Sequence, residues 1–130
     1  LASRIKAGTP IDLSLMGHVN VIWQGDANAQ TLRSLRHCTT PASPLNVSGP
    51  ETLSVRWLAE ELAARLDTRA KLEGTESETA WLTNSAEATR LFGYPSVPLS
   101  VMLDWVANWV AHERPSFNKP TKFEVRDGDF

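Results

Sequence analysis

Hydrophobic residues recur at helical spacing in several stretches of the chain. The clearest stretch follows Ser54, which we predict to be the N-cap of a helix ending near Leu66. Its apolar positions follow the i, i+3, i+4, i+7 pattern of a half-buried helix: Val55, Leu58, Ala59, Leu62, Ala63 and Leu66. A second stretch predicts a helix over 99–111 that stops before Pro115 and buries Leu99, Met102, Leu103, Val106 and Val110.

Two further helices are marked by their end signals. Residues 1–8 resemble the last turns of a helix, with Leu1 and Ile5 on one face and Gly8 as its left-handed stop. The sequence Asn84-Ser85-Ala86-Glu87 has capping-box spacing and begins a helix that ends at Gly93.

Between these helices, residues 19–29 read VNVIWQGDANA, an abrupt change from a strand pattern to a helix pattern. We expect Asp26 to be the N-cap of a helix over about 27–36, with Ala29, Leu32 and Leu35 on one face. The alternative is a carboxylate that lines a cleft at the end of the strand.

The remaining apolar runs are short. Strands are predicted over 10–15, 19–24 and 45–47, and one or two more within the mixed segment 71–82. Three or four strands of four to six residues cannot form a large sheet. The sequence therefore predicts a small α+β lobe with four to five helices, which packs against something else.

Composition narrows the class of protein. The chain has 130 residues, 42% hydrophobic and 22% charged, and a net charge of −2, which suits one globular domain. The sequence has no cluster of Lys or Arg, so neither nucleic acid nor an anionic membrane is predicted as a partner. No apolar run is as long as a membrane-spanning helix requires. Cys38 is the only cysteine, so no internal disulfide forms, and we expect a cytoplasmic protein.

Residue patterns typical of catalysis are missing from the sequence. The glycines are too far apart for a G-x-G-x-x-G turn or a P-loop, and the single tyrosine, Tyr94, has Pro98 rather than Lys four residues on. His18, His37 and His112 lack metal-ligand spacing, and Cys38 has no identifiable base. Trp23 and Trp81, at strand ends, are the better candidates for a binding surface, whereas the helical tryptophans are expected to pack: Trp57, Trp105 and Trp109.

The order of three segments resembles the C-terminal part of the extended short-chain dehydrogenase/reductases, the NAD-dependent epimerase/dehydratase enzymes. The segments are VNVIWQGDANAQTLRSL, PLNVSGPETLSVRWLAEELAARL and TNSAEATRLFGYPSVPLSVMLDWVANWV. The resemblance runs over roughly residues 1–112. It implies a substrate-binding lobe over 1–114, followed by a surface tail over 115–130 that is not part of the family pattern.

The resemblance also implies where the chemistry lies. In this family the cofactor turn and the Tyr/Lys pair belong to an N-terminal Rossmann domain, so this chain is expected to be a fragment with no catalytic, cofactor-binding or metal residues. NAD or NADP is implied for the parent enzyme, and His18, Asn20 and Trp23 are predicted to bind a small-molecule substrate. The missing Rossmann domain is the expected partner, and without it we expect self-association through an apolar face near Ile5, Val21, Trp23 and Leu45.

Two departures from the family pattern bear on the substrate. Sugar-nucleotide members carry an Arg where Val19 stands, and a second Arg in the loop that here reads Glu73-Gly74-Thr75-Glu76-Ser77-Glu78. Because Arg is a bidentate ligand for pyrophosphate, we expect a carbonyl or hydroxyl compound other than a nucleotide sugar. The competing hypotheses are a free-standing, non-catalytic interaction module derived from the same lobe, and a hydrolase using Asp26 and Glu51, for which no second polar partner is visible.

Overall fold

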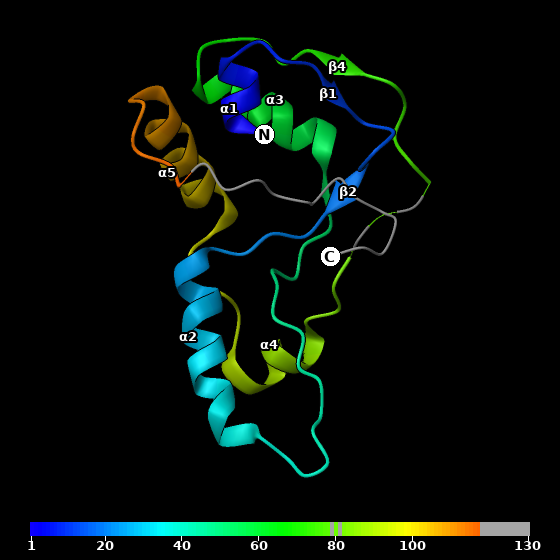
Figure 1. Ribbon diagram of the computed structural model, residues 1–130, viewed down its shortest axis with the longest axis vertical. Helices are drawn as coiled ribbons and strands as arrows, with labels where there is room; N and C mark the ends of the chain where they lie inside the picture. Colours follow the sequence, from blue (N-terminus) through cyan, green and yellow to red (C-terminus); the bar gives the residue numbers. More distant parts are fainter. Residues whose placement is uncertain (79, 81, 118–130) are drawn as a thin grey trace.

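The chain folds into two unequal parts in the computed structural model, which describes residues 1–78, 80 and 82–117 (Figure 1). In the described residues the α-helices are α1 (Ala2–Lys6), α2 (Gln24–Ser34), α3 (Val55–Arg65), α4 (Ala86–Phe92) and α5 (Leu99–Ala111). A 3₁₀ helix, Leu35–His37, directly follows α2. The strands are β1 (Ile11–Asp12), β2 (His18–Val19), β3 (Leu53–Ser54) and β4 (Leu72–Glu73). The predicted α+β class is confirmed.

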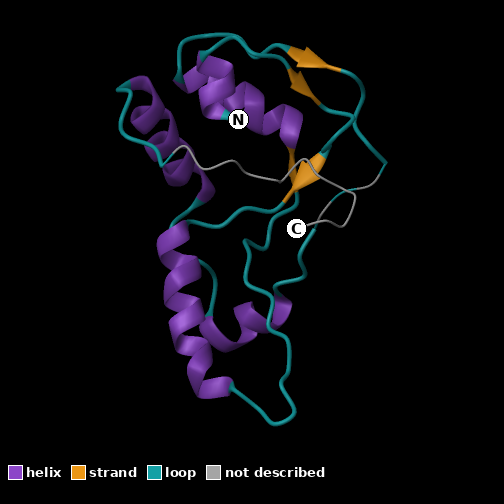
Figure 2. Ribbon diagram, in the orientation of Figure 1, coloured by secondary structure: helices purple, strands orange, loops and turns teal. Residues whose placement is uncertain are grey.

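Helices α1, α3 and α5 pack together beside the short strands and form the larger part, whereas α2 and α4 pair in the smaller part (Figures 1 and 2). The core lies in the larger part, where Ile5 and Leu13 have the most deeply buried large side chains. The apolar face of α3 closes this core with Val55, Leu58, Ala59, Leu62 and Ala63, as its periodicity predicts.

The strands are shorter than the sequence suggests, at two residues each. β1 pairs in parallel with β4 through Ile11 and Leu72, and β2 pairs antiparallel with β3 through Val19 and Leu53. The predicted strand at 45–47 does not form, because its backbone has no neighbouring ladder. An extended segment becomes a strand only when a partner accepts its backbone hydrogen bonds.

Only the first residue of the strand predicted over 19–24 is paired with another strand. From Asn20 on, side-chain hydrogen bonds and a close backbone contact replace strand pairing. The Asn20 side-chain amide donates to the Thr83 carbonyl at 3.1 Å and accepts from the Thr83 N–H at 2.9 Å. One residue on, Gly49 lies so close to Val21 that a Cβ there would come 1.9 Å from the Val21 carbonyl oxygen. Only glycine permits this close approach of two backbones.

Helix-end signals in the sequence are confirmed at most positions. The Ser54 hydroxyl accepts from the Trp57 N–H at 3.3 Å and caps α3. Gly8 and Gly93 both have positive φ, 67° and 81°, just past the ends of α1 and α4. At the start of α4 the N-cap position is Ser85, whose side chain makes no capping bond, and the Asn84 side chain accepts from the Ala86 N–H at 3.0 Å. Glu87 pairs with Arg90, so the predicted capping box does not form.

Helix α2 differs from its prediction in both start and orientation. It begins at Gln24 with Trp23 in the N-cap position, so Asp26 lies inside the first turn and the prediction that it caps the helix is wrong. The face that carries Leu32 and Leu35 is exposed, since each of these side chains is 69% exposed. The buried residue of α2 is Gln30, because α4 packs on the other side of the helix.

The bounds of α5 match the prediction, but its buried face is narrower than predicted. Leu103 and Ala107 are buried, Met102 and Val110 are half-buried, and Val106 is exposed. The prediction that Val106 is buried is therefore wrong. Ile5, which we expected near an exposed apolar face, is only 2% exposed because α1 packs between α3 and α5.

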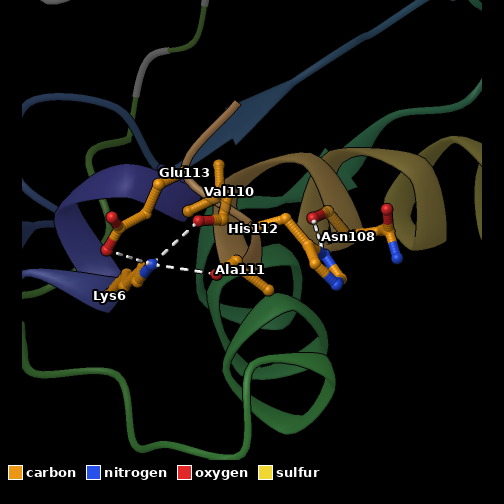
Figure 3. Close-up of polar contacts among 6 residues, drawn as sticks. All are labelled: Lys6, Asn108, Val110, Ala111, His112 and Glu113. Atoms are coloured by element: carbon orange, nitrogen blue, oxygen red, sulfur yellow. Dashed lines mark hydrogen bonds and ion pairs between the residues drawn. The ribbon is translucent and has the colours of Figure 1, made fainter. Parts of the chain in front are cut away.

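The C-terminal end of α5 is held by a lysine from α1 (Figure 3). The Lys6 ammonium group donates to the carbonyls of Val110 at 3.0 Å and Ala111 at 3.1 Å, and pairs with Glu113 at 3.1 Å. The Val110 carbonyl also accepts from the Glu113 N–H at 3.2 Å, whereas the Ala111 carbonyl has no backbone partner among the described residues. A cation from another element therefore completes the hydrogen bonding of this helix end. Lys6 thereby fixes α5 against α1.

Replacing Lys6 with Met should lower the free energy of unfolding by about 1 kcal/mol, since the variant leaves these carbonyls to water. Urea unfolding followed by tryptophan fluorescence measures the change. Lys71→Met is the matched control, because the Lys71 side chain has no hydrogen bond or ion pair within the described residues. Equal losses in the two variants would contradict the assigned role of Lys6.

Candidate functional site

The three residues predicted to bind substrate lie along one segment that runs from β2 into α2. His18 is half-buried in β2 and pairs in register with Ser54, at the start of α3. Asn20 is half-buried, and both polar atoms of its side chain bind the backbone of Thr83. Trp23 is 36% exposed at the N-terminus of α2. The three share one short segment but line no common hollow among those described here, and Asn20 is already engaged in holding the chain.

The Trp23 ring lies where the two parts of the lobe meet. It contacts Trp105 of α5 edge-to-face, with ring centroids 5.1 Å apart. Gly25 leaves room for the indole, because a Cβ at this position would come 2.5 Å from Trp23 Nε1. Trp105 is 46% exposed and Trp109, one turn later on α5, is 53% exposed. Trp105 therefore packs against another ring, as predicted, although all three rings keep part of their surface exposed.

Asp26 ties α2 to the connection between α4 and α5. Its carboxylate accepts from the Ser96 hydroxyl at 2.6 Å and from the Val97 N–H at 3.0 Å. Partial burial acts to raise the pKa of Asp26, but the hydrogen bonds from Ser96 and Val97 together lower it below its ordinary value. The carboxylate is therefore ionised at neutral pH and acts as a tether between distant segments.

An apolar hollow of about 400 Å³ opens between α1, α3, α5 and the residues around β2. Its lining includes Leu15, Val21, Leu58, Met102 and Val106, and among the described residues that line it the only polar side chains are those of Asp12 and Asn20. Asp12 accepts from the Ser14 hydroxyl and N–H, and these bonds lower its pKa. The hollow is thus an uncovered part of the core.

A second hollow of about 510 Å³ lies between the loop at 50–52 and the segment 82–89. We call it the polar hollow, because its lining carries several hydroxyl groups and amides, among them Thr52, Thr83 and Ser85. Asn20 borders both hollows. Its bond to Thr83 therefore fixes a part of the wall of each.

The acidic loop at 73–78 has one internal counter-charge. Arg56 of α3 donates to Glu76 at 2.5 Å, and this hydrogen bond holds the pKa of Glu76 below its usual range, with a smaller contribution from His18 nearby. Glu73 and Glu78 form no ion pair within the described residues. Of the three glutamates counted in the sequence of this loop, Glu76 is therefore neutralised by Arg56.

The other candidate residues do not converge on a reactive centre. Within the described part of the chain, no three His, Cys, Asp or Glu side chains lie close enough to hold a metal ion. His37 contacts the Phe92 ring at 5.6 Å, the His112 ring nitrogen Nδ1 lies 2.9 Å from the Asn108 carbonyl (Figure 3), and Cys38 is exposed. Trp81 lies outside the described residues.

Comparison with known proteins identifies the fold. UDP-glucuronic acid 4-epimerase from Bacillus cereus in complex with NAD matches with a TM-score of 0.65 and 17% identity, over 88% of this chain and 39% of the epimerase chain. The same enzyme in complex with UDP-glucuronic acid and NAD gives a TM-score of 0.64 and 17% identity, over 87% of this chain and 38% of that chain. This chain has the same fold as one part of that enzyme. No protein-family model and no curated protein matches the sequence.

The epimerase match agrees with the resemblance carried by the three sequence segments, and it concerns the fold alone. The chain spans about two fifths of the length of the matched epimerases. None of the described helices is long and apolar enough to cross a membrane. The hollows were missed in the sequence because their walls come from segments far apart, such as Leu15 of the β1–β2 connection and Val106 of α5.

Replacing Asp26 with Ala should lower the free energy of unfolding by about 1–3 kcal/mol at neutral pH, because both hydrogen bonds to a charged acceptor are lost. The folded-state pKa lies below the ordinary aspartate value of about 3.9, so this stabilisation is complete above that value and is lost as pH falls through the folded pKa. Urea unfolding at several pH values should show a constant difference from wild type at neutral pH that shrinks below about pH 4.

Ser96→Ala provides the matched comparison, since it removes one donor to the same carboxylate. A double-mutant cycle should give a smaller combined loss than the sum of the single losses. Additive losses, or a difference that does not shrink in acid, would contradict the tether.

Proposed function

We propose that this chain is the substrate-binding lobe of an NAD(P)-dependent oxidoreductase of the epimerase/dehydratase type. The observation that carries the proposal is the match of 88% of this chain to only 39% of an NAD-bound epimerase. The order of the sequence segments supports it independently, since the capped helices α3 and α4 stand where the family pattern expects them. The lobe by itself is expected to be catalytically inert.

The cofactor is assigned to the rest of the enzyme. A nucleotide cofactor needs closely spaced glycines whose backbone approaches the pyrophosphate, and the glycines of this sequence are too far apart to supply them. Its residues therefore do not fit NAD, and no catalytic step is assigned to them. His18, Asn20 and Trp23 are proposed to contact the substrate: His18 through its ring nitrogens, Asn20 by fixing the cleft wall, and Trp23 through its exposed ring.

The proposed substrate is a carbonyl or hydroxyl compound other than a nucleotide sugar. Val19 stands where the sugar-nucleotide enzymes carry an Arg, and it offers no charge to a pyrophosphate. Arg56, the cation that contacts the acidic loop, is occupied by Glu76, and Glu73 and Glu78, which have no ion pair within the described residues, add negative charge to the same loop. An anionic substrate would have to displace Glu76 from Arg56 before it gained a bidentate partner.

The apolar hollow is the proposed contact with the cofactor-binding domain. Its lining consists of core side chains, among them Leu58, Leu62 and Leu103, which are nearly fully buried yet border open space. Exposed apolar groups at its rim, Leu15 and Val106, extend the surface. A surface of this kind normally contacts another part of a protein.

The complete reading frame that encodes this chain should bind NADH, and the 130-residue chain alone should not. Titration calorimetry and the change in NADH fluorescence measure both. Micromolar binding of NADH by the isolated chain would contradict the assignment of the cofactor to another domain. A reading frame that contains no cofactor-binding region would instead favour the free-standing interaction module.

Val106→Asp should reduce both self-association of the isolated chain and its binding of the dye anilinonaphthalene sulfonate, because the new charge lies at the rim of the apolar hollow. Sedimentation velocity and dye fluorescence measure the two effects. Leu32→Asp is the matched control, since Leu32 is exposed on α2 and does not border the hollow. A wild-type chain that stays monomeric and binds no dye would mean that the lobe needs no cover.

A further inference from the structure

The fold brings together three arginines that form no cluster in the sequence. Arg33 lies near the C-terminal end of α2, Arg36 lies in the 3₁₀ helix that follows, and Arg90 lies on α4, which packs beside α2 (Figure 1). All three residues are exposed, as is His37. We call the surface formed by these four residues the arginine surface.

Phe92, at the end of α4, connects the two helices at this surface. Its carbonyl accepts from Arg33 Nη1 at 3.2 Å, and the Arg33 guanidinium lies over its ring, 4.8 Å from the centroid. The His37 ring contacts the same ring edge-to-face, with centroids 5.6 Å apart. Within the described residues only one of the five guanidinium N–H groups of Arg33 is used, so a cation that is already held in place can still donate to an anion.

Negative charge is scarce around these cations. No acidic residue occurs between Asp26 and Glu51, and Asp26 lies in the first turn of α2, at its other end. On α4, Glu87 accepts two hydrogen bonds from Arg90, which hold the pKa of Glu87 below its usual range, and His37 makes a smaller contribution. One of the three arginines is therefore neutralised within the chain.

The other two arginines keep their charge. The Arg36 side chain forms no hydrogen bond or ion pair within the described residues, and the contacts of Arg33 are with an uncharged carbonyl and ring. Two unneutralised guanidinium groups thus lie three residues apart, although the chain as a whole has a net charge of −2. Like charges at this spacing repel each other, and a carboxylate bound between them would remove the repulsion.

The surroundings of these arginines favour a protein segment as the source of the carboxylate. Leu35, which directly precedes Arg36, is 69% exposed and offers an apolar contact beside the cations. Neither the apolar nor the polar hollow is lined by any residue of the arginine surface, so a small anion would gain little enclosure there. A peptide gains affinity from several contacts on an open surface, and clusters of Arg recognise acidic motifs in this way.

A nucleic acid is a poorer fit to the same residues. The Phe92 ring is already contacted by Arg33 and His37, so it is not free to stack on a base. The Glu87 carboxylate would also lie beside a phosphate backbone and repel it.

We propose that the arginine surface binds an acidic segment of a partner protein, in which carboxylates flank an apolar side chain. Arg33 and Arg36 donate to the carboxylates, and the apolar side chain contacts Leu35. Both hollows lie outside this surface, so this contact is separate from the proposed substrate and from the apolar contact with the cofactor-binding domain.

The probe for this contact is the peptide acetyl-ELEELE-amide, titrated into the isotope-labelled 130-residue chain while amide chemical shifts are recorded. We expect saturable shifts at Arg33, Arg36 and His37 at about millimolar peptide. Arg36→Gln should weaken binding about three- to tenfold, because one charge-assisted contact is lost, and should fold normally because the side chain is exposed and unpaired within the described residues. The matched control is Arg69→Gln, the same change at an exposed arginine between α3 and β4, which should leave the affinity unchanged.

Glu87→Gln changes the charge in the opposite direction. It releases Arg90 from its ion pair and removes a competing carboxylate, so it should tighten peptide binding about two- to fivefold. The uncharged peptide acetyl-QLQQLQ-amide should produce no saturable shifts. Because the affinity depends on exposed charges, it should also fall as the salt concentration rises.

Three results would overturn the proposal. The first is a chain that shows no saturable shifts with the acidic peptide. The second is an equal loss of affinity in Arg36→Gln and Arg69→Gln, which would mean attraction by overall charge rather than by this surface. The third is binding of inorganic phosphate or of a short oligothymidylate at the same residues that is as tight as that of the peptide, which would make the surface a general anion site.

Discussion

Hydrogen bonds from two side chains, Asn20 and Asp26, join the larger and smaller parts of the lobe, because no strand is long enough to do so. Asn20 reproduces both backbone bonds of a strand pair with a side-chain amide, through its two contacts with Thr83. Six residues later, the Asp26 carboxylate binds the connection before α5 at Ser96 and Val97. Backbone groups that a longer sheet would satisfy are satisfied here by side chains. Both hollows depend on this segment, since Asn20 borders each of them.

Local signals in the sequence predicted the local features of the fold. The α3 cap at Ser54, the ends at Gly8 and Gly93 and the bounds of α5 each depend on residues a few positions apart. Long-range partners could not be predicted in the same way. Asp26 has the residue type and position of a helix cap, yet its partners lie 70 and 71 residues away. The spacing of Leu32 and Leu35 correctly indicated a helix, but the face that becomes buried depends on where α4 packs.

The charge of the acidic loop likewise depends on a long-range partner that the sequence could not predict. The sequence contains three glutamates between 73 and 78, but it does not show that Arg56, twenty residues before Glu76, neutralises one of them. The loop is therefore less negative than the count of residues suggests. The proposal that the substrate is not a nucleotide sugar therefore depends chiefly on Val19, which carries no charge. The linings of the hollows are assembled only in the folded chain, so the sequence could not show them.

The two hollows make different demands on the protein. The apolar hollow is bordered by core side chains such as Leu58 and Leu103, which lose packing contacts on the open side, so covering it would stabilise the fold itself. The polar hollow is lined by groups that water can solvate, so it imposes little cost when empty. A surface whose cover stabilises the fold suits a permanent protein contact, whereas one that tolerates solvent needs no cover. Asn20 borders both hollows. If a covering domain shifted Val19 and Val21, the hydrogen bonds between Asn20 and Thr83 would therefore transmit the shift to the wall of the polar hollow.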